Sequence, residues 1–209
     1  MSNRDYIVFY INGKRLEVRD ERIFMPLANF LRYEKDHTGT KIVCAEGDCG
    51  ACTVLQAKPK RDQLNDVPLD YVSCNSCILP VFLLDGCSVI TVEGMELSPS
   101  QLDPIQESFV RCNASQCGFC TPGFIMATAS LYEKKSQPTK KDVQNYLTGN
   151  LCRCTGYDSI IQAGCEVENT NRDRLQERYF DPSMNQDLLN HSQKTIRMDF
   201  GEQCKYFAP

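Results

Sequence analysis

The sequence lacks the features that mark several large classes of protein. No apolar run approaches the ~20 residues that a membrane-spanning helix needs, and no apolar signal region precedes a small-residue cleavage site near the start. Basic residues are in deficit, because 23 lysines and arginines face 27 acidic residues and the formal charge is −4. We therefore expect a soluble, cytoplasmic protein with no membrane partner and no nucleic-acid partner.

Histidine is also scarce. His37 and His191 are the only two histidines and share no motif, so we expect both on the solvated surface rather than in an acid–base site. The remaining composition is ordinary: 209 residues, 42% hydrophobic and 24% charged, suit one or two globular domains with a real core. Wholesale disorder and a fibrous chain are thereby excluded.

Cysteine is the outlier, with 13 residues in the chain. A chain kept in a reducing cytosol does not rely on structural disulfides, so clustered cysteines there indicate metal binding or redox chemistry. Most of them fall into three tight groups, which a compact metal centre requires. The full set is Cys44, Cys49, Cys52, Cys74, Cys77, Cys87, Cys112, Cys117, Cys120, Cys152, Cys154, Cys165 and Cys204.

The first group has the spacing C-x4-C-x2-C, formed by Cys44, Cys49 and Cys52. This is the plant-type [2Fe–2S] pattern, in which a fourth cysteine comes from further along the chain. Spacing alone leaves Cys74 and Cys77 both open as that fourth ligand. Small residues between the ligands let the loop wrap closely and point its backbone N–H groups at sulfur. A zinc knuckle is disfavoured, because zinc ribbons use paired C-x2-C motifs.

The second constellation combines a C-x2-C pair, Cys117 and Cys120, with a C-x-C pair, Cys152 and Cys154. A lone C-x2-C also suits zinc or a redox dithiol. Together the two pairs supply four thiolates, and the C-x-C step is unusual for a zinc site built from two knuckles. The spacing therefore favours a second Fe–S centre over zinc and leaves zinc as the alternative.

The residues up to about 94 predict a small α+β unit. Alternating strands flank Asn12-Gly13 over residues 6–19, which is a strong hairpin signal. A helix is expected over residues 26–36. Further strands are expected at residues 53–57, 71–73 and 88–92, and the first cysteine loop lies among these elements.

Beyond residue 94 the pattern becomes helical. Helices are expected over residues 104–111, 121–135, 139–149 and 159–165, with Thr121 as an N-cap and Thr139 opening a capping box with Asp142. From residue 166 the chain is polar without a clear period, which predicts a linker or an arm lying on a partner.

The strings Cys44-x4-Cys49-Gly-Ala-Cys52-Thr, Gln116-Cys-Gly-Phe-Cys-Thr-Pro-Gly and Gly149-Asn-Leu-Cys-Arg-Cys-Thr-Gly-Tyr157 resemble the iron–sulfur part of the molybdenum hydroxylases, the xanthine dehydrogenase and aldehyde oxidase family. The resemblance covers about residues 6–165. It implies a β-grasp [2Fe–2S] ferredoxin domain over residues 1–95 and a four-helix [2Fe–2S] domain over 96–166. Residues 167–209 become an extended linker toward an FAD domain, because Tyr206-Phe-Ala-Pro209 is similar to the opening of such a domain.

The resemblance also implies ligands and a role. Within Asn75-Ser-Cys77-Ile-Leu-Pro80 it assigns the fourth ligand of the first cluster to Cys77 and leaves Cys74 as a bystander. Gln116 matches the glutamine that hydrogen-bonds the pterin of the molybdenum cofactor; a plain helix-end amide is the alternative. The implied ligands are Cys44, Cys49, Cys52 and Cys77 for the first cluster and Cys117, Cys120, Cys152 and Cys154 for the second.

The implied function is electron transfer within an oxidoreductase complex, with no catalytic residue in this chain. Electrons from a molybdopterin centre in a large partner subunit or domain pass through the helical-domain cluster and then the ferredoxin-type cluster to FAD. The long linker favours a xanthine-dehydrogenase-like enzyme acting on xanthine or hypoxanthine. An aldehyde oxidase, another N-heterocycle or carbon monoxide dehydrogenase, and a free-standing ferredoxin-like carrier are the alternatives.

Overall fold

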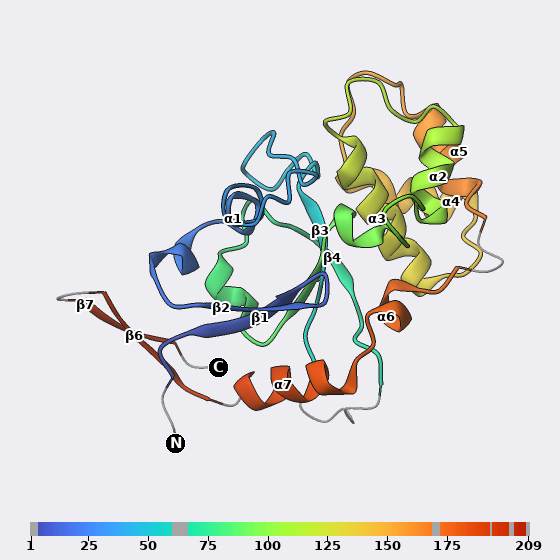
Figure 1. The fold of residues 1–209 in the computed structure, drawn as a ribbon. Helices are drawn as coiled ribbons and strands as arrows, with labels where there is room; N and C mark the ends of the chain where they lie inside the picture. Colours follow the sequence, from blue (N-terminus) through green and yellow to red (C-terminus); the bar gives the residue numbers. More distant parts are fainter. Residues whose placement is uncertain (1–3, 60–66, 169–171, 193, 201–202, 208–209) are drawn as a thin grey trace.

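The computed structural model describes residues 4–59, 67–168, 172–192, 194–200 and 203–207. They form a small sheet with helices on both of its faces, which confirms the predicted mixture of strands and helices (Figure 1). Among these residues, no helix combines the length and the apolar character needed to cross a membrane.

The main sheet has the strand order β2-β1-β5-β3-β4. Its members are β1 (Ile7–Ile11), β2 (Lys14–Val18), β3 (Thr53–Ala57), β4 (Val72–Asn75) and β5 (Ser88–Ile90). The hairpin predicted for β1 and β2 is confirmed, and Asn12 and Gly13 take the positive φ values of 49° and 75° that its tight turn requires. Strand β5 pairs parallel with β1 and antiparallel with β3, so the N-terminal hairpin is joined to the strands beyond the first cysteine loop.

Both faces of this sheet are buried. Alternate residues of β1 point to opposite faces, so Ile7 and Phe9 join one core cluster while Val8 and Tyr10 join another. The hydrophobic cluster that contains Ile7 and Phe9 is covered by α1 (Leu27–Glu34), whose Leu27, Phe30 and Leu31 are buried in it. Short 3₁₀ turns border the sheet: η1 (Glu21–Phe24), η2 (Val81–Leu84) and η3 (Val92–Met95).

The second face is covered by the helical part of the chain. Its elements are α2 (Pro104–Arg111), α3 (Thr121–Lys134), α4 (Lys140–Tyr146), η4 (Leu147–Gly149) and α5 (Asp158–Cys165). Helix α3 packs on β3, and its Phe124 shares a core cluster with Leu55 and Ile90 of the sheet. The sheet and the helices therefore share one apolar interior, which fixes the positions of the loops that each carries.

The predicted N-terminal caps of two helices can be compared with the structure. The predicted capping box of α4 is confirmed: Asp142 N donates to Thr139 Oγ1 at 3.2 Å and Thr139 N donates to Asp142 Oδ2 at 2.7 Å. The predicted N-cap at Thr121 is wrong by one residue, because Thr121 is already helical and Cys120 occupies the cap position. The Thr121 hydroxyl instead donates to Ser115 Oγ at 2.9 Å.

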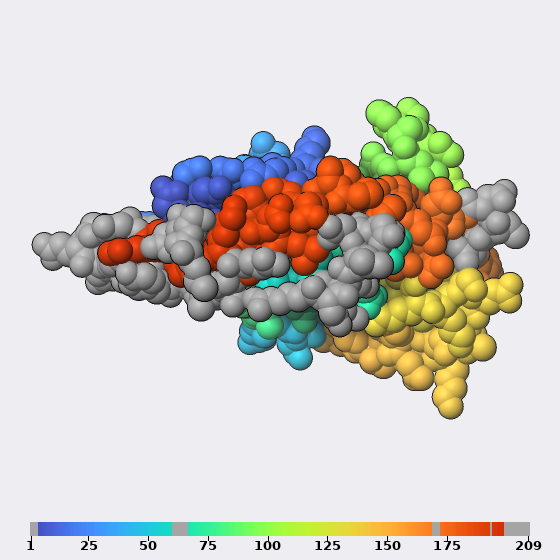
Figure 2. Space-filling model, turned by 90° about the horizontal axis from the view of Figure 1, so that it is seen from below, coloured from blue at the N-terminus to red at the C-terminus, as the bar shows by residue number. Residues whose placement is uncertain are grey.

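The expected extended linker over residues 167–209 is wrong in its conformation where the structure describes it. It contains α6 (Leu175–Arg178), α7 (Pro182–Ser192), β6 (Ile196–Phe200) and β7 (Gln203–Phe207). Leu175, Met184 and Leu188 are buried in the same core as α3, and burial of these apolar side chains holds the segment in place. Figure 2 shows this tail running along one face of the molecule, from the helical part toward the N-terminal strands. Ala208 and Pro209, the end of the Tyr-Phe-Ala-Pro string, lie outside the described residues.

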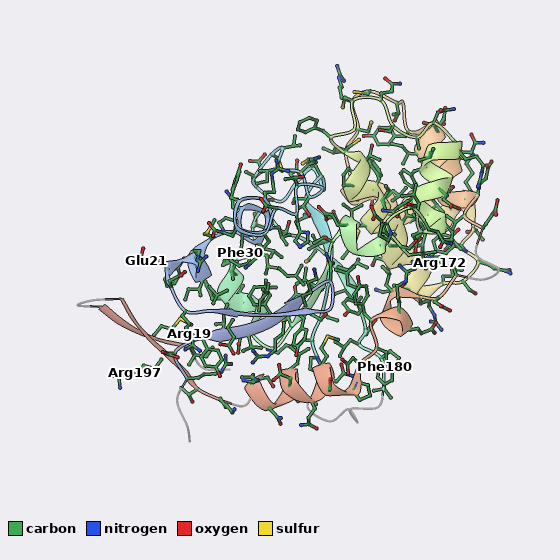
Figure 3. The ribbon with its side chains drawn as sticks, viewed as in Figure 1. Arg19, Glu21, Phe30, Arg172, Phe180 and Arg197 are labelled. Atoms are coloured by element: carbon green, nitrogen blue, oxygen red, sulfur yellow. The ribbon has the colours of Figure 1, made fainter. Side chains whose placement is uncertain are left out.

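A buried group of charges fastens the start of this tail. Arg172, labelled in Figure 3, donates from Nε to both carboxylate oxygens of Asp103 at 3.1 and 3.2 Å. Arg178 contacts Asp103 Oδ2 at 2.8 Å. The carboxylate of Glu133 accepts from the backbone N–H groups of Leu175 and Gln176 at 2.8 and 2.9 Å. The side chains of Arg172, Asp103 and Glu133 are at most 1% exposed, so these ionic contacts are shielded from water.

A second buried ion pair ties the tail to the N-terminal end of the sheet. Arg4 forms two hydrogen bonds with the Asp85 carboxylate and donates from Nη2 to the His191 carbonyl at 2.9 Å. Nearby, Asp187 of α7 accepts from Tyr10 Oη at 2.9 Å and from Arg15 Nε at 2.8 Å. His191, expected on the surface, is 8% exposed, and its ring Nδ1 lies 2.8 Å from the Asp187 carbonyl.

Candidate metal centres

The first cysteine loop, residues 44–52, connects α1 to β3 in a tightly wrapped conformation. Ala45, Gly47 and Gly50 have φ values of 61°, 84° and 68°, a region that suits residues with little or no side chain. A Cβ added at Gly47 would lie 2.6 Å from Ile78 Cδ1, so glycine also allows the segment around Ile78 to approach. Asn75 reinforces that approach by donating from Nδ2 to the Gly47 carbonyl at 2.5 Å.

The three thiols of this loop and that of Cys77 lie in two pairs. Cys49 N donates to Cys44 Sγ at 3.4 Å, and Cys77 N donates to Cys52 Sγ at 3.4 Å. Hydrogen bonds from the backbone N–H groups of Glu46 and Cys49 lower the pKa of Cys44 to about 6, which favours its thiolate. Burial, together with the neighbouring Cys52 thiol, raises the pKa of Cys77 to about 12. The structure therefore brings together Cys44, Cys49, Cys52 and Cys77.

Cys74 has different surroundings. It lies on β4 in register with Val54 and packs against the core on the α1 side of the sheet. Burial raises its pKa to about 12. Its backbone is part of the sheet, whereas Cys77 follows the strand and packs with Cys52 and Ala28.

The second set of thiols also lies in two pairs. Cys117 and Cys120 precede α3, and Cys152 and Cys154 lie between η4 and α5. Cys154 Sγ lies 3.6 Å from Cys117 Sγ. Burial and a side-chain hydrogen bond with Cys152 raise the pKa of Cys120 to about 12. Burial opposes ionisation of Cys152 as well, but hydrogen bonds from the Thr155 hydroxyl and backbone N–H groups outweigh it and lower the pKa.

Tyr157 holds the C-x-C segment in shape. Its backbone has a φ of 72°, an unusual value for an aromatic residue. That conformation turns the ring back so that the hydroxyl accepts from Cys152 N at 2.9 Å. The ring also meets Phe124 of α3 edge-on, with the centroids 6.2 Å apart. The aromatic residue therefore fastens the Cys152 segment to the helix that follows Cys120, a role that the sequence analysis missed.

The pairing of thiols distinguishes between kinds of metal site. Among the residues that the structure describes, no three His, Cys, Asp or Glu side chains converge as ligands of a single ion. A tetrahedral zinc site would gather all four thiols around one point. In a four-cysteine [2Fe–2S] site two thiolates serve each iron, so the ligands form two separate pairs. Both sets therefore fit a two-iron cluster better than a single zinc ion.

The segments that carry the two sets of thiols are joined by direct hydrogen bonds. Leu151 N donates to the Cys49 carbonyl at 2.9 Å, and Asn150 Nδ2 donates to the Gly50 carbonyl at 2.9 Å. A pocket of about 520 Å³ lies between them and is lined by Cys49 together with all four thiols of the second set. The apolar rim of this pocket is exposed at Val43, Phe119 and Leu151, by 57%, 57% and 52%.

Gln116 lies beside this pocket's second thiol set, directly before Cys117, and is exposed. In the described part of the chain its side-chain amide has no hydrogen-bond partner. Cys87, Cys112 and Cys165, which match no family ligand, lie away from both sets. Cys87 is buried in the α1-side core, and Cys112 contacts Glu166 at 3.4 Å. The side chain of Cys204 lies outside the described residues.

Comparisons with known proteins agree with these motifs. A family model for a [2Fe-2S] binding domain matches residues 91–165. Aldehyde oxidase 4 from Cavia porcellus is 36% identical over 181 residues, which cover 82% of this chain and 13% of that protein. Xanthine dehydrogenase/oxidase from Mus musculus is 41% identical over 158 residues, or 76% of this chain and 12% of that protein. The chain thus spans about an eighth of the length of these relatives.

Solved structures extend the likeness to the fold. Quinoline 2-oxidoreductase from Pseudomonas putida 86 is 37% identical, with a TM-score of 0.65 over 77% of this chain and 90% of the matched chain. Aldehyde oxidoreductase from Desulfovibrio gigas is 29% identical, with a TM-score of 0.67 over 78% of this chain and 16% of the matched chain. The chain therefore belongs to the molybdenum hydroxylase family of oxidoreductases, as the iron–sulfur electron-transfer region of a xanthine dehydrogenase or aldehyde oxidase type.

Proposed function

We propose that this chain conducts electrons from a molybdopterin centre to FAD through two [2Fe–2S] clusters. Cys44, Cys49, Cys52 and Cys77 hold one cluster, and Cys117, Cys120, Cys152 and Cys154 hold the other. When bound, each cluster supplies a site that accepts and releases an electron. The molybdopterin and the FAD belong to partner subunits or domains.

The observation that carries the proposal is the pairing of thiols. Both sets provide two thiol pairs, and backbone N–H groups point at Cys44 and Cys152. Such hydrogen bonds stabilise thiolate sulfur and the negative charge of a bound cluster. The exclusion of Cys74 is supported by its place within β4 and by its packing into the core on the α1 side.

The proposed direction of electron transfer rests on the solvent exposure of the thiols. Two thiols of the second set, Cys117 and Cys154, are exposed next to the amide of Gln116, whereas no thiol of the first set is exposed. We assign Gln116 to a hydrogen bond with the pterin, which places the second thiol set on the side of the molybdenum centre. The hydrogen bond from Leu151 N to the Cys49 carbonyl then joins the second set to the first, which delivers electrons toward FAD.

The domain division follows from the same motifs. We propose a ferredoxin-type domain over residues 1–95, a four-helix [2Fe–2S] domain over residues 96–166, and a connecting segment over 167–209 that leads toward the FAD domain. The shared interior between sheet and α3 supports a single electron-transfer module made of both domains. It argues against a free-standing ferredoxin-like carrier, which needs only the first motif.

We propose xanthine or hypoxanthine as the substrate of the complete enzyme. The support is the identity of 40–41% with several xanthine dehydrogenases, against 36% and 39% for two aldehyde oxidases. Aldehydes are the second candidate, because the aldehyde oxidase 4 alignment extends over 82% of the chain, further than the 76% found for the mouse xanthine dehydrogenase/oxidase.

The test uses the native assembly, isolated anaerobically through a tag on this chain. Addition of xanthine should bleach the visible cluster absorbance without any added reductant. Bleaching by an aldehyde but not by xanthine would shift the substrate to the second candidate. A colourless protein that contains zinc would overturn the whole proposal.

A further inference from the structure

The three cysteine-bearing segments of the chain meet at a single point. Gly50 comes from the first loop, Gly123 from the helix after Cys120, and Asn150 from the stretch before Cys152. A Cβ added at Gly123 would collide with the Gly50 carbonyl oxygen, and one added at Gly50 would lie 2.5 Å from Asn150 Nδ2. Two glycines thus leave just enough room for one side chain to enter between the loops.

Asn150 is the side chain that fills this point. The residue is 5% exposed, and its Nδ2 donates to the Gly50 carbonyl at 2.9 Å while lying 3.5 Å from Thr53 Oγ1. Thr53 also donates to the Gly50 carbonyl, at 2.6 Å. Because the contact is buried, water cannot easily replace the amide if it is removed.

The backbone of Asn150 is fixed independently of its side chain. Asn150 N donates to the Leu147 carbonyl at 3.0 Å, which ties the residue to the turn after α4. The next residue, Leu151, donates to the Cys49 carbonyl at 2.9 Å. Two consecutive residues on one segment therefore bond two consecutive carbonyls on the other, and the pair resists both sliding and rotation of one loop against the other.

We propose that Asn150 is a positioning residue that sets the separation and relative orientation of the two clusters. The inference rests on the proposed function, because it requires clusters bound at both thiol sets. Asn150 touches neither cluster in this proposal. It acts by holding the Gly50 carbonyl, and hence the neighbouring Cys49 and Cys52, at a fixed place relative to Cys152.

Magnetic coupling between the reduced clusters tests this directly, since through-space coupling falls with the cube of their separation. The native assembly is reduced with dithionite, and the splitting in its low-temperature EPR spectrum is compared with that of Asn150→Ala. We expect the splitting to weaken and broaden, while the signal of each cluster and the iron content are retained. Asn145→Ala, an exposed asparagine on α4, is the matched control and should leave the splitting unchanged.

Thr53→Val provides a second variant of nearly equal volume that removes the other side-chain donor to the Gly50 carbonyl. We expect a smaller change in the same direction, and this variant decides the question if Asn150→Ala fails to load its clusters. Unaltered splitting in a fully loaded Asn150→Ala, or in Thr53→Val when the first variant does not load, would overturn the inference. Absence of two cluster signals in the wild type would instead refute the proposed function.

Discussion

Arg172 offers a sharp test of how the tail is attached. Its guanidinium contacts Asp103 through Nε, and its Nη1 lies 3.6 Å from Glu133 Oε1. Arg172→Met keeps a long apolar side chain and removes the charge. In this variant both carboxylates keep other hydrogen-bond donors. Arg178 and Ile105 N still donate to Asp103, and two backbone N–H groups still donate to Glu133.

The size of the effect follows from those contacts. Removing one partner of a buried ion pair costs about 3–5 kcal/mol of unfolding free energy. The remaining partners of both carboxylates place Arg172→Met at the lower end, about 3 kcal/mol. In the part of the chain that the structure describes, Nη1 and Nη2 of Arg172 are buried without a hydrogen-bond partner, which also keeps the loss from being larger.

Urea unfolding of the holoprotein, followed by far-UV circular dichroism under anaerobic conditions, measures this cost. With a typical slope of 1–3 kcal/mol per molar urea, the midpoint should fall by about 1–3 M. Arg22→Met makes the same chemical change at a side chain that is 46% exposed and paired on the surface. Exposed pairs contribute about 0.2–1 kcal/mol, so this control should lose much less. Equal losses in the two variants would refute the reasoning.

Three further predictions concern the metal loops and the tail. Cys77→Ser should lose one of the two cluster signals in EPR while Cys74→Ser retains both, because Cys77 packs with Cys52 beyond the strand whereas Cys74 packs into the core on the α1 side. Two complete clusters in Cys77→Ser would contradict the ligand assignment. Gly123→Ala should lower the urea midpoint, because overpacking costs about 1–3 kcal/mol of unfolding free energy. Gly149→Ala should be tolerated because its added Cβ meets nothing within 4 Å; equal midpoints in the two variants would show that the Gly50 carbonyl can move. Burial raises the pKa of Asp187, but hydrogen bonds from Arg15 and Tyr10 outweigh it and lower the pKa, so its contribution to stability is present above an unfolded pKa of about 3.9 and is lost as the pH falls below it. After correction for the slower intrinsic exchange at low pH, the hydrogen-exchange protection of α7 should therefore fall on acidification more in the wild type than in Asp187→Asn, and identical pH profiles of protection would argue against this link.

The elements that the sequence predicted correctly depend on near neighbours. The β1–β2 hairpin follows from Asn12-Gly13 between two alternating strands, and the start of α4 follows from Thr139 and Asp142 three residues apart. The grouping of cysteines was equally local. It identified the candidate ligands. Spacing could not decide between Cys74 and Cys77 as the fourth ligand of the first cluster, because they are only three residues apart, with Cys74 on β4 and Cys77 just after it.

The features that the sequence did not predict depend on distant partners. Helix α7 carries only Met184, Leu188 and Leu189 as buried apolar residues among polar ones, and its stability comes from packing on a core that includes β1. The contact between Asn150 and Gly50 joins residues 100 positions apart. The pattern of residues around Asn150 does not indicate that Gly50 is its partner. The role of Gly50 and Gly123 in leaving room for the Asn150 side chain becomes evident only when the segments are adjacent in the fold.

The buried contact between Arg4 and the His191 carbonyl has a consequence for synthesis. The two residues are 187 positions apart, so at about 5–20 residues per second the contact waits about 10–40 s after Arg4 is made. All eight proposed thiol ligands lie within residues 44–154 and leave the ribosome earlier. Loading of iron and closure of the tail over the N-terminal strands are therefore separable in time, with the thiols available first.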